Sequence, residues 1–483
     1  MTSLPFNPRL LRGAPQPLHV QLAGEIRDAA LHGRLPAGTR LPGSRSLAQT
    51  LGISRGVVEE AYGLLTSDGT LEAVVGSGTR VAAGLHPHPA PQEIGPGTAP
   101  PWFQTRTMPH SARLDAREGL HFRSGVTSCA MLDEQAWKRA WARATDLPLP
   151  GEYGDLAGLH DLRVALAAFT GRLRGLASTP EQVVLTSGSL NSLGLIARGV
   201  LPPRATVLYE NPGYRSGHAV LQAAGHTLVP VPVDANGLVV ADLPPAQAVY
   251  VTPSHQFPLG GRMSLARRLA LLEWAQVQRA IILEDDYDGE FRYDAPPLPP
   301  LASLDGSGRV LYLGTFSKIL SPALRLGFVV AAPDLVAALV RERFLTDGGP
   351  ALAGQVALLH LLRSGDLDRH LRRARRWHAQ VRQALTEELA PLAPHAVLGG
   401  IEAGLHVCLH LNPPLDAEDI SARLAERQVY AETLTTFTFT GAPAQALVLG
   451  HGGLTLAEVR VGTHHLRQVI TQALRDTTSE NTL

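Results

Sequence analysis

The chain has 483 residues, a formal net charge of +0, 45% hydrophobic residues and two cysteines. The neutral balance excludes strong attraction of the whole chain to nucleic acid or to a membrane surface. Two cysteines cannot form a disulfide framework, no apolar run is long enough to span a membrane, and no signal peptide is recognisable. We therefore expect a cytoplasmic protein with no membrane partner, and its length predicts more than one domain.

Prolines and glycines crowd the stretch between residues 83 and 114, where they oppose regular helix and sheet. We interpret residues 83–114 as an extended linker. It separates a small domain at residues 15–82 from a large domain at residues 115–477.

Apolar spacing in the small domain predicts three helices, over residues 17–32, 44–51 and 55–66. Ser44 can cap the second helix and Ser54 the third, with a tight glycine turn between the two helices. Two short strands then flank residues 76–78. Helix, turn, helix and hairpin in this order predict a winged helix-turn-helix.

Three side chains cluster where the second and third helices begin, and these are Arg45, Ser54 and Arg55. From there they can reach DNA phosphates and base edges. The alternative is a small three-helix packing module with solvated arginines. The ordered motif favours DNA binding over that alternative.

The small domain resembles the winged helix of GntR-family regulators in residues 33–42, 44–45, 51–55 and 76–79. Gly56 departs from the family pattern by removing a polar side chain at the start of the third helix. The resemblance implies double-stranded DNA as a partner. It implicates four DNA-binding residues, which are Arg45, Ser54, Arg55 and Gly78.

The large domain alternates short apolar runs with helical stretches. Candidate strands cover residues 183–186, 206–209, 248–252, 280–283, 310–313 and 328–331. This alternation predicts an α/β fold with a mostly parallel sheet covered by helices. Ligands of such sheets bind where the strands end at their carboxyl side.

Chemically useful residues follow five of these strands. They are Ser187, Gly188 and Ser189, then Tyr214, then His255, then Asp285 and Tyr287, and then Lys318 with Arg325 seven positions later. A turn such as Ser187–Ser189 is alone equally typical of any strand-to-helix connection. Lys318 is one of only two lysines among 43 lysine and arginine residues. It is either a surviving surface residue, as we expect for Lys138, or a reactive amine that arginine cannot replace.

Together these groups fit one small molecule. A lysine can form a Schiff base with an aldehyde, a buried carboxylate needs a cation such as a pyridinium, and a phenol can bond a ring oxygen. A glycine-serine helix start and an arginine can bind a phosphate. These properties describe pyridoxal 5'-phosphate. No metal site is predicted.

The large domain resembles fold-type I aminotransferases over nearly its whole length, with a smaller C-terminal α/β subdomain expected. The motifs at residues 252–258 and 284–293 carry the resemblance, and fusion to a GntR-like winged helix is the MocR architecture. It implies an internal aldimine at Lys318, a pyridine contact from Asp285, a ring-oxygen contact from Tyr287 with His255 nearby, and stacking by Tyr214. It further implies phosphate contacts from Ser187, Gly188, Ser189 and Arg325, a partner-subunit phosphate contact from Tyr153, and a carboxylate clamp at Arg460.

The combined expectation is a homodimeric, pyridoxal-phosphate-dependent transcription regulator. An amino compound, or the cofactor itself, would be sensed through the aldimine at Lys318. Two alternatives stay open. One is an active aminotransferase with an accessory DNA-binding domain, and the other is a DNA-binding module on an aminotransferase scaffold that holds no cofactor.

Overall fold

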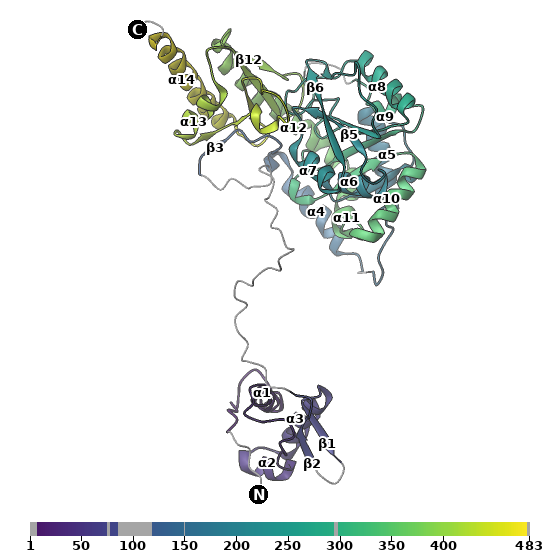
Figure 1. Cartoon of the computed structure of the whole chain (residues 1–483), viewed down its shortest axis with the longest axis vertical. Helices are drawn as coiled ribbons and strands as arrows, with labels where there is room; N and C mark the ends of the chain where they lie inside the picture. Colours follow the sequence, from purple (N-terminus) through teal and green to yellow (C-terminus); the bar gives the residue numbers. More distant parts are fainter. Residues whose placement is uncertain (1–6, 75–77, 86–117, 149, 294–297, 481–483) are drawn as a thin grey trace. The chain divides into compact units, whose positions relative to one another are not determined.

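A computed structural model describes residues 7–74, 78–85, 118–148, 150–293 and 298–480 (Figure 1). The chain divides into two compact units, Met1–Arg106 and Thr107–Leu483. Apart from residues 83–85, the predicted linker lies outside the described residues. Among the helices that the structure describes, none combines the length and apolar character that crossing a membrane requires.

The first unit packs three helices against a two-stranded antiparallel hairpin (Figure 1). Its elements are α1 (Leu18–Leu31), α2 (Ser44–Leu51), α3 (Arg55–Ser67), β1 (Leu71–Val74) and β2 (Gly78–Val81). One apolar core, which includes Leu22, Leu47 and Val81, joins the helices to the hairpin. The predicted winged helix-turn-helix is confirmed.

Helix capping in this unit differs from the prediction at one point. Gly43 is the N-cap residue of α2, and no side chain caps that helix. Ser44 is instead the first helical residue, and its hydroxyl donates to Glu59 Oε1 at 3.2 Å. Ser54 caps α3 as predicted, because its Oγ accepts from Val57 N at 3.4 Å.

The second unit is built on an eight-stranded mixed sheet in the order β4-β11-β10-β9-β8-β5-β6-β7. The strands are β4 (Val183–Thr186), β5 (Thr206–Asn211), β6 (Thr227–Asp234), β7 (Gly237–Leu238), β8 (Ala248–Val251), β9 (Ile281–Asp285), β10 (Val310–Thr315) and β11 (Gly327–Val330). Sequence patterning missed β6, because Pro230 and Pro232 argue against a strand. They are tolerated because β6 pairs with β5 along one side and meets β7 only at its end.

Strand direction decides which residues meet at the ligand edge. β6, β5, β8, β9 and β10 are mutually parallel, whereas β11 runs antiparallel to both of its neighbours, β10 and β4. The carboxyl ends of β4, β5, β8, β9 and β10 therefore share one edge, and β11 begins there. This reversal brings Arg325, which precedes β11, to the edge that Lys318 reaches after β10.

Helices cover both faces of the sheet. Leu185 packs with residues of α4, α5 and α11, whereas its neighbour Val184 packs with residues of α6 and α10. Successive strand side chains point to opposite faces, so these are two separate cores. The helices around the sheet, taken over both faces, are α4 (Glu134–Thr145), α5 (His160–Arg174), α6 (Ser189–Gly199), α7 (Arg215–Ala223), α8 (Leu265–Gln278), α9 (Leu301–Leu304), α10 (Pro333–Thr346) and α11 (Leu352–Arg363).

A smaller C-terminal subdomain carries a four-stranded antiparallel sheet in the order β12-β13-β16-β15. Its elements are α12 (Asp366–Leu389), β12 (Ala396–Gly399), β13 (His406–Leu411), α13 (Ala417–Ala425), β14 (Val429–Tyr430), β15 (Glu432–Thr433), β16 (Ala446–Gly450) and α14 (Leu456–Glu480). β3 (Leu120–His121) pairs in parallel with β14. The start of the described second unit is therefore joined to its C-terminal part.

Candidate functional site

Lys318 follows β10 and turns its amine inward. Its Nζ donates a hydrogen bond to Gly125 O, in the segment that follows β3. Burial lowers the pKa of the Lys318 amine, and the nearby carboxylates of Asp288 and Asp285 oppose that shift. A buried amine with a lowered pKa is deprotonated more easily than a surface lysine, which suits a nucleophile. Lys138 differs, because it is exposed on α4 and pairs with Glu134 at 2.7 Å.

Asp285 ends β9 and is 3% exposed. Tyr250 Oη donates to its Oδ2 at 2.7 Å, but Oδ1 has no hydrogen-bond partner among the described residues. Burial raises the pKa of Asp285 to about 7, and the Tyr250 hydroxyl only partly opposes that shift. A buried carboxyl oxygen without a partner costs free energy, so this position is suited to a cationic or N–H-bearing ligand.

Tyr287, His255 and Asp288 form a buried network beside Asp285. Tyr287 Oη donates to His255 O at 3.0 Å and also lies 3.0 Å from His255 Nδ1. The same ring nitrogen lies 3.0 Å from Asp288 Oδ2. The network therefore ties the loop after β8 to the loop after β9 and fixes the phenol of Tyr287.

Three side chains of this region could in principle ligate a metal ion. His255, Asp288 and His406 each offer a ligand atom, and these atoms lie within 4.8 Å of one another. Each side chain already has hydrogen-bond partners in the protein. Asp288 Oδ2 accepts from Leu405 N at 3.3 Å, and His406 Nε2 lies 3.1 Å from Pro258 O. We therefore interpret the group as support for Tyr287.

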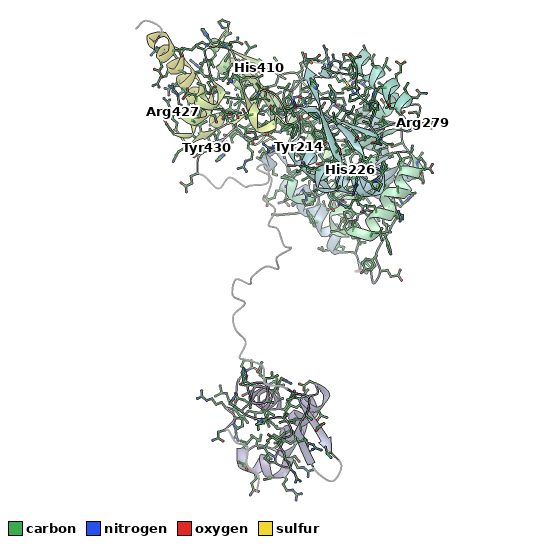
Figure 2. All side chains as sticks on the ribbon, in the orientation of Figure 1. Tyr214, His226, Arg279, His410, Arg427 and Tyr430 are labelled. Carbon is green, nitrogen blue, oxygen red and sulfur yellow. The ribbon has the colours of Figure 1, made fainter. Side chains whose placement is uncertain are left out.

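The loop between β4 and α6 forms a cradle next to Arg325. Gly188 is the N-cap of α6 with a φ of 99°, a conformation that favours glycine. A Cβ atom at Gly188 would lie 3.7 Å from the guanidinium of Arg325. The hydroxyl of Tyr214 hydrogen-bonds to Ser189 and Ser216, and burial raises its pKa to about 12. Tyr214 lies between the large sheet and the C-terminal subdomain (Figure 2).

Two predicted residues are not brought to this cluster. Tyr153 is 89% exposed, in the loop before α5. Arg460 lies on the exposed side of α14, whereas its helix neighbours Val459 and Thr463 are fully buried. The carboxylate clamp at Arg460 and the partner contact of Tyr153 stay predictions.

The predicted DNA-binding residues gather on the first unit. Arg45, Ser54 and Arg55 are all exposed, close to the starts of α2 and α3. Gly78 begins β2 with a φ of 87°, and a Cβ atom there would lie 3.4 Å from Nε of Arg40. An exposed basic helix start beside a hairpin is the face that helix-turn-helix proteins turn to DNA.

The structure places in or next to the cluster several residues that the sequence does not single out. Tyr250 lies inside a strand rather than after one, and its ring stacks on Tyr209 with centroids 4.6 Å apart. Asp288 belongs to the quoted motif, but the motif alone did not identify its histidine partner. Arg174, at the end of α5, donates to Asp286 Oδ2 at 2.7 Å and to Ser254 Oγ at 2.9 Å. No local pattern identifies that long-range ion pair.

The donor set fits pyridoxal phosphate. Lys318 offers a buried amine to an aldehyde, and Asp285 offers an unpartnered oxygen to a protonated ring nitrogen. Tyr287 offers a phenol to the ring oxygen. The helix start at Gly188, together with Arg325, suits a phosphate.

Comparison with known proteins gives matches for both units. A family model described as aminotransferase class I and II matches residues 127–447, and one described as bacterial regulatory proteins, gntR family, matches residues 18–81. The chain is 35% identical to the HTH-type pyridoxine biosynthesis transcriptional regulator PdxR of Corynebacterium glutamicum, over 91% of this chain and 92% of that protein. It is 34% identical to the probable rhizopine catabolism regulatory protein MocR of Rhizobium meliloti, over 94% of each.

Among solved structures, the second unit is similar to LysN, the alpha-aminoadipate aminotransferase of Thermus thermophilus, complexed with N-(5'-phosphopyridoxyl)-L-leucine. The TM-score is 0.67 at 27% identity, and the match covers 74% of this chain and 93% of that one.

Proposed function

We propose a sensing function for this chain, which belongs to the aminotransferase class I and II family and carries a GntR-type DNA-binding domain, as MocR-type regulators do. It senses a small amino compound, or pyridoxal phosphate itself, at Lys318. It is a pyridoxal-phosphate-dependent transcription regulator. The observation that carries the sensing proposal is the pairing of a buried amine at Lys318 with a buried, unpartnered carboxyl oxygen at Asp285.

Each polar group near Lys318 has a role in this proposal. Lys318 would hold the cofactor covalently, and Asp285 Oδ1 would accept from its ring nitrogen. Tyr287, supported by His255, would bond the ring oxygen, and Tyr214 would pack on the ring. Ser187, Gly188, Ser189 and Arg325 would hold the phosphate. When bound, pyridoxal phosphate supplies an aldehyde that exchanges one amine for another.

Effector binding needs a route from Lys318 to the rest of the protein. A free Lys318 amine donates to Gly125 O. The segment around Gly125 is bonded to the C-terminal subdomain, because Phe122 N donates to Tyr430 O at 2.8 Å and Ser124 Oγ donates to Glu432 Oε2 at 3.2 Å. An effector amine that displaces Lys318 therefore changes whether this segment is held by the lysine. We propose this segment as the element that the effector biases.

We also propose that the chain works as a homodimer in the cytoplasm. Tyr153 is 89% exposed, so its hydroxyl is available to contact the cofactor phosphate of a second copy. Two winged helices in one dimer would then bind two half-sites.

A pair of lysine variants tests the attachment site. Full-length protein supplied with pyridoxal phosphate should show a visible absorption band and be trapped by borohydride. Lys318→Ala should lose both, and Lys138→Ala should keep both, because Lys138 is exposed on α4. Trapping that persists in Lys318→Ala would assign the attachment to another amine.

A mobility shift tests regulation. The wild-type chain should bind DNA from upstream of its own gene, and a panel of amino compounds should change that affinity in wild type but not in Lys318→Ala. An active aminotransferase with an accessory DNA-binding domain is the alternative. Multiple-turnover production of keto acids without specific DNA binding would favour it. Near-full-length similarity to proteins named as regulators makes it the less favoured function.

A further inference from the structure

The third helix of the first unit carries an acidic residue, Glu59, beside Arg55. Glu59 Oε1 accepts from Arg55 Nε at 2.8 Å, lies 2.7 Å from Arg55 Nη2, and accepts from Ser44 Oγ at 3.2 Å. Glu59 also lines a cavity of about 370 Å³ together with Arg40, which precedes α2, with Ser44 at the start of α2 and with Gly78 of the hairpin. The carboxylate therefore lies among the groups that we expect to approach DNA.

Two features make this carboxylate more than a surface charge. Glu59 lies one helical turn after Arg55, so the two side chains share one face of α3. Within the described part of the chain, the hydrogen bonds to Glu59 all go to Oε1, and none goes to Oε2. The pair thus presents a fixed guanidinium next to an available carboxylate oxygen.

DNA chemistry limits what this oxygen can meet. Phosphates repel a carboxylate, as do the carbonyl and ring-nitrogen acceptors of guanine and thymine. In the major groove the hydrogen-bond donors on base edges are the amino groups of cytosine N4 and adenine N6. A carboxylate that enters the groove without such a donor loses its hydration without compensation.

We propose that Glu59 is a specificity-determining residue of the DNA interface, where Oε1 fixes Arg55 and Oε2 accepts a hydrogen bond from a base amino group, cytosine N4 or adenine N6. Arg55 then reads guanine beside that base, because a guanidinium pairs with guanine O6 and N7. This inference rests on the DNA-binding function of the GntR-type domain and adds the base chemistry that it recognises.

Selection from a random-sequence duplex library tests the proposal with the full-length, cofactor-loaded chain. The wild-type protein should require an amino-bearing base, cytosine or adenine, at one position next to a guanine. The base that is enriched identifies the donor. Replacing it by thymine or guanine should weaken wild-type binding roughly tenfold or more. Glu59→Gln should reduce that discrimination to about twofold, because an amide both donates and accepts.

Glu60→Gln is the matched control. It removes the same charge from the same helix, but Glu60 pairs with His19 of α1 at 3.0 Å. Glu60→Gln should keep the wild-type base preference, and both variants should unfold at the wild-type temperature. A preference unchanged in Glu59→Gln, or relaxed equally in both variants, overturns the proposal. If the wild-type chain selects no sequence at all, the DNA-binding function itself fails instead.

Discussion

The two units of this protein expose their functional chemistry in opposite ways. In the DNA-binding unit, Arg45 and Arg55 lie in solvent, and the Arg55–Glu59 pair is more than half exposed on the arginine side. In the cofactor unit, Asp285 is buried and Lys318 is partly buried with its amine turned inward. Burial raises the pKa of Asp285 and lowers that of the Lys318 amine, which favours the neutral form of each group.

This difference determines how each site can be identified. A buried polar atom without a hydrogen-bond partner costs free energy, so the unpartnered Oδ1 of Asp285 indicates a position where a ligand binds. An exposed arginine has water as its partner and carries no such cost. DNA-binding residues must therefore be inferred from their place in the helix-turn-helix, whereas the cofactor residues are also indicated by their energetics.

The largest expected effect comes from a buried ion pair. Arg174→Met removes the guanidinium that lies 2.7 Å from the buried Asp286 carboxylate, whose remaining hydrogen bonds include one from Tyr312 Oη at 2.7 Å. We expect a loss of about 3–5 kcal/mol in the free energy of unfolding. Urea unfolding followed by tryptophan fluorescence measures this, since four of the five tryptophans, Trp137, Trp141, Trp274 and Trp377, lie in the second unit.

Arg172→Met is the control for this comparison on the same helix. Arg172 and Asp368 form an exposed pair at 3.1 Å, with side chains 53% and 33% exposed. Removing such a pair should cost less than about 1 kcal/mol. Similar losses in both variants would break the contrast between buried and exposed charges.

The next largest effect is expected at Asp285, where one substitution should raise the stability of the cofactor-free protein and lower its affinity for the cofactor. Because burial raises the pKa of Asp285 from 3.8 to about 7, the folded chain keeps a proton that the unfolded chain releases. Stability is therefore lost as pH rises from about 4 to about 7, and no further above that. Asp285→Asn removes this dependence, so the cofactor-free variant should gain a few kcal/mol over wild type at pH 8 and little at pH 4.

The same substitution should weaken cofactor binding. An amide cannot neutralise a protonated ring nitrogen, so we expect affinity for pyridoxal phosphate to fall tenfold or more. Glu210, Glu284 and Glu290 also have pKa values raised to about 7 by burial, so only the difference between variant and wild type isolates Asp285. Equal stability of the two proteins at both pH values would contradict the raised pKa.

The helix-turn-helix, six of the eight strands of the large sheet and the meeting of strand-end residues around Lys318 could be predicted from the sequence. Local signals are strong there, such as the glycine turn before Ser54 and polar groups that follow apolar strands. The two-residue strand β7 has too short a pattern to be recognised, and in β6 Pro230 and Pro232 mask a strand that pairs mainly on one side. The contact between Arg174 and Asp286 could not be predicted either, because 112 residues separate them and only the fold brings them together.

Arg460 marks a different limit. A short motif with an arginine and a glycine predicts a ligand clamp at Arg460, and this stays a prediction; residues 459–463 belong to a helix with a period that buries Val459 and Thr463 and exposes Arg460. A motif read without its secondary structure does not say which way a side chain points. Gly188 and Arg325 differ, because strand topology brings them to one edge of the sheet, while their role in binding a phosphate stays a prediction.

The smallest expected effect tests the exposed side of the comparison. Arg55→Ala should weaken binding to a selected operator by about 1–3 kcal/mol if Arg55 reads a base. Its exposed pair with Glu59 contributes little to folding, so the free energy of unfolding should change by less than about 0.5 kcal/mol. Titrations at several salt concentrations identify the contact, because a base-reading arginine leaves the salt slope unchanged and a phosphate-binding one reduces it by about 1.

Arg27→Ala provides the matched loss of charge. Arg27 lies on α1 and pairs through Nε at 2.9 Å with Asp68, the C-cap of α3, at the opposite end of that helix from Arg55. Its removal should leave operator affinity nearly unchanged. If both variants weaken binding equally, the first unit attracts DNA only through its overall charge, and the placement of Arg55 at the start of α3 has no special role. If only Arg55→Ala weakens binding, Arg55 determines DNA recognition while contributing almost nothing to folding stability. Arg174 is the opposite case, because it is buried and its main contribution is to stability.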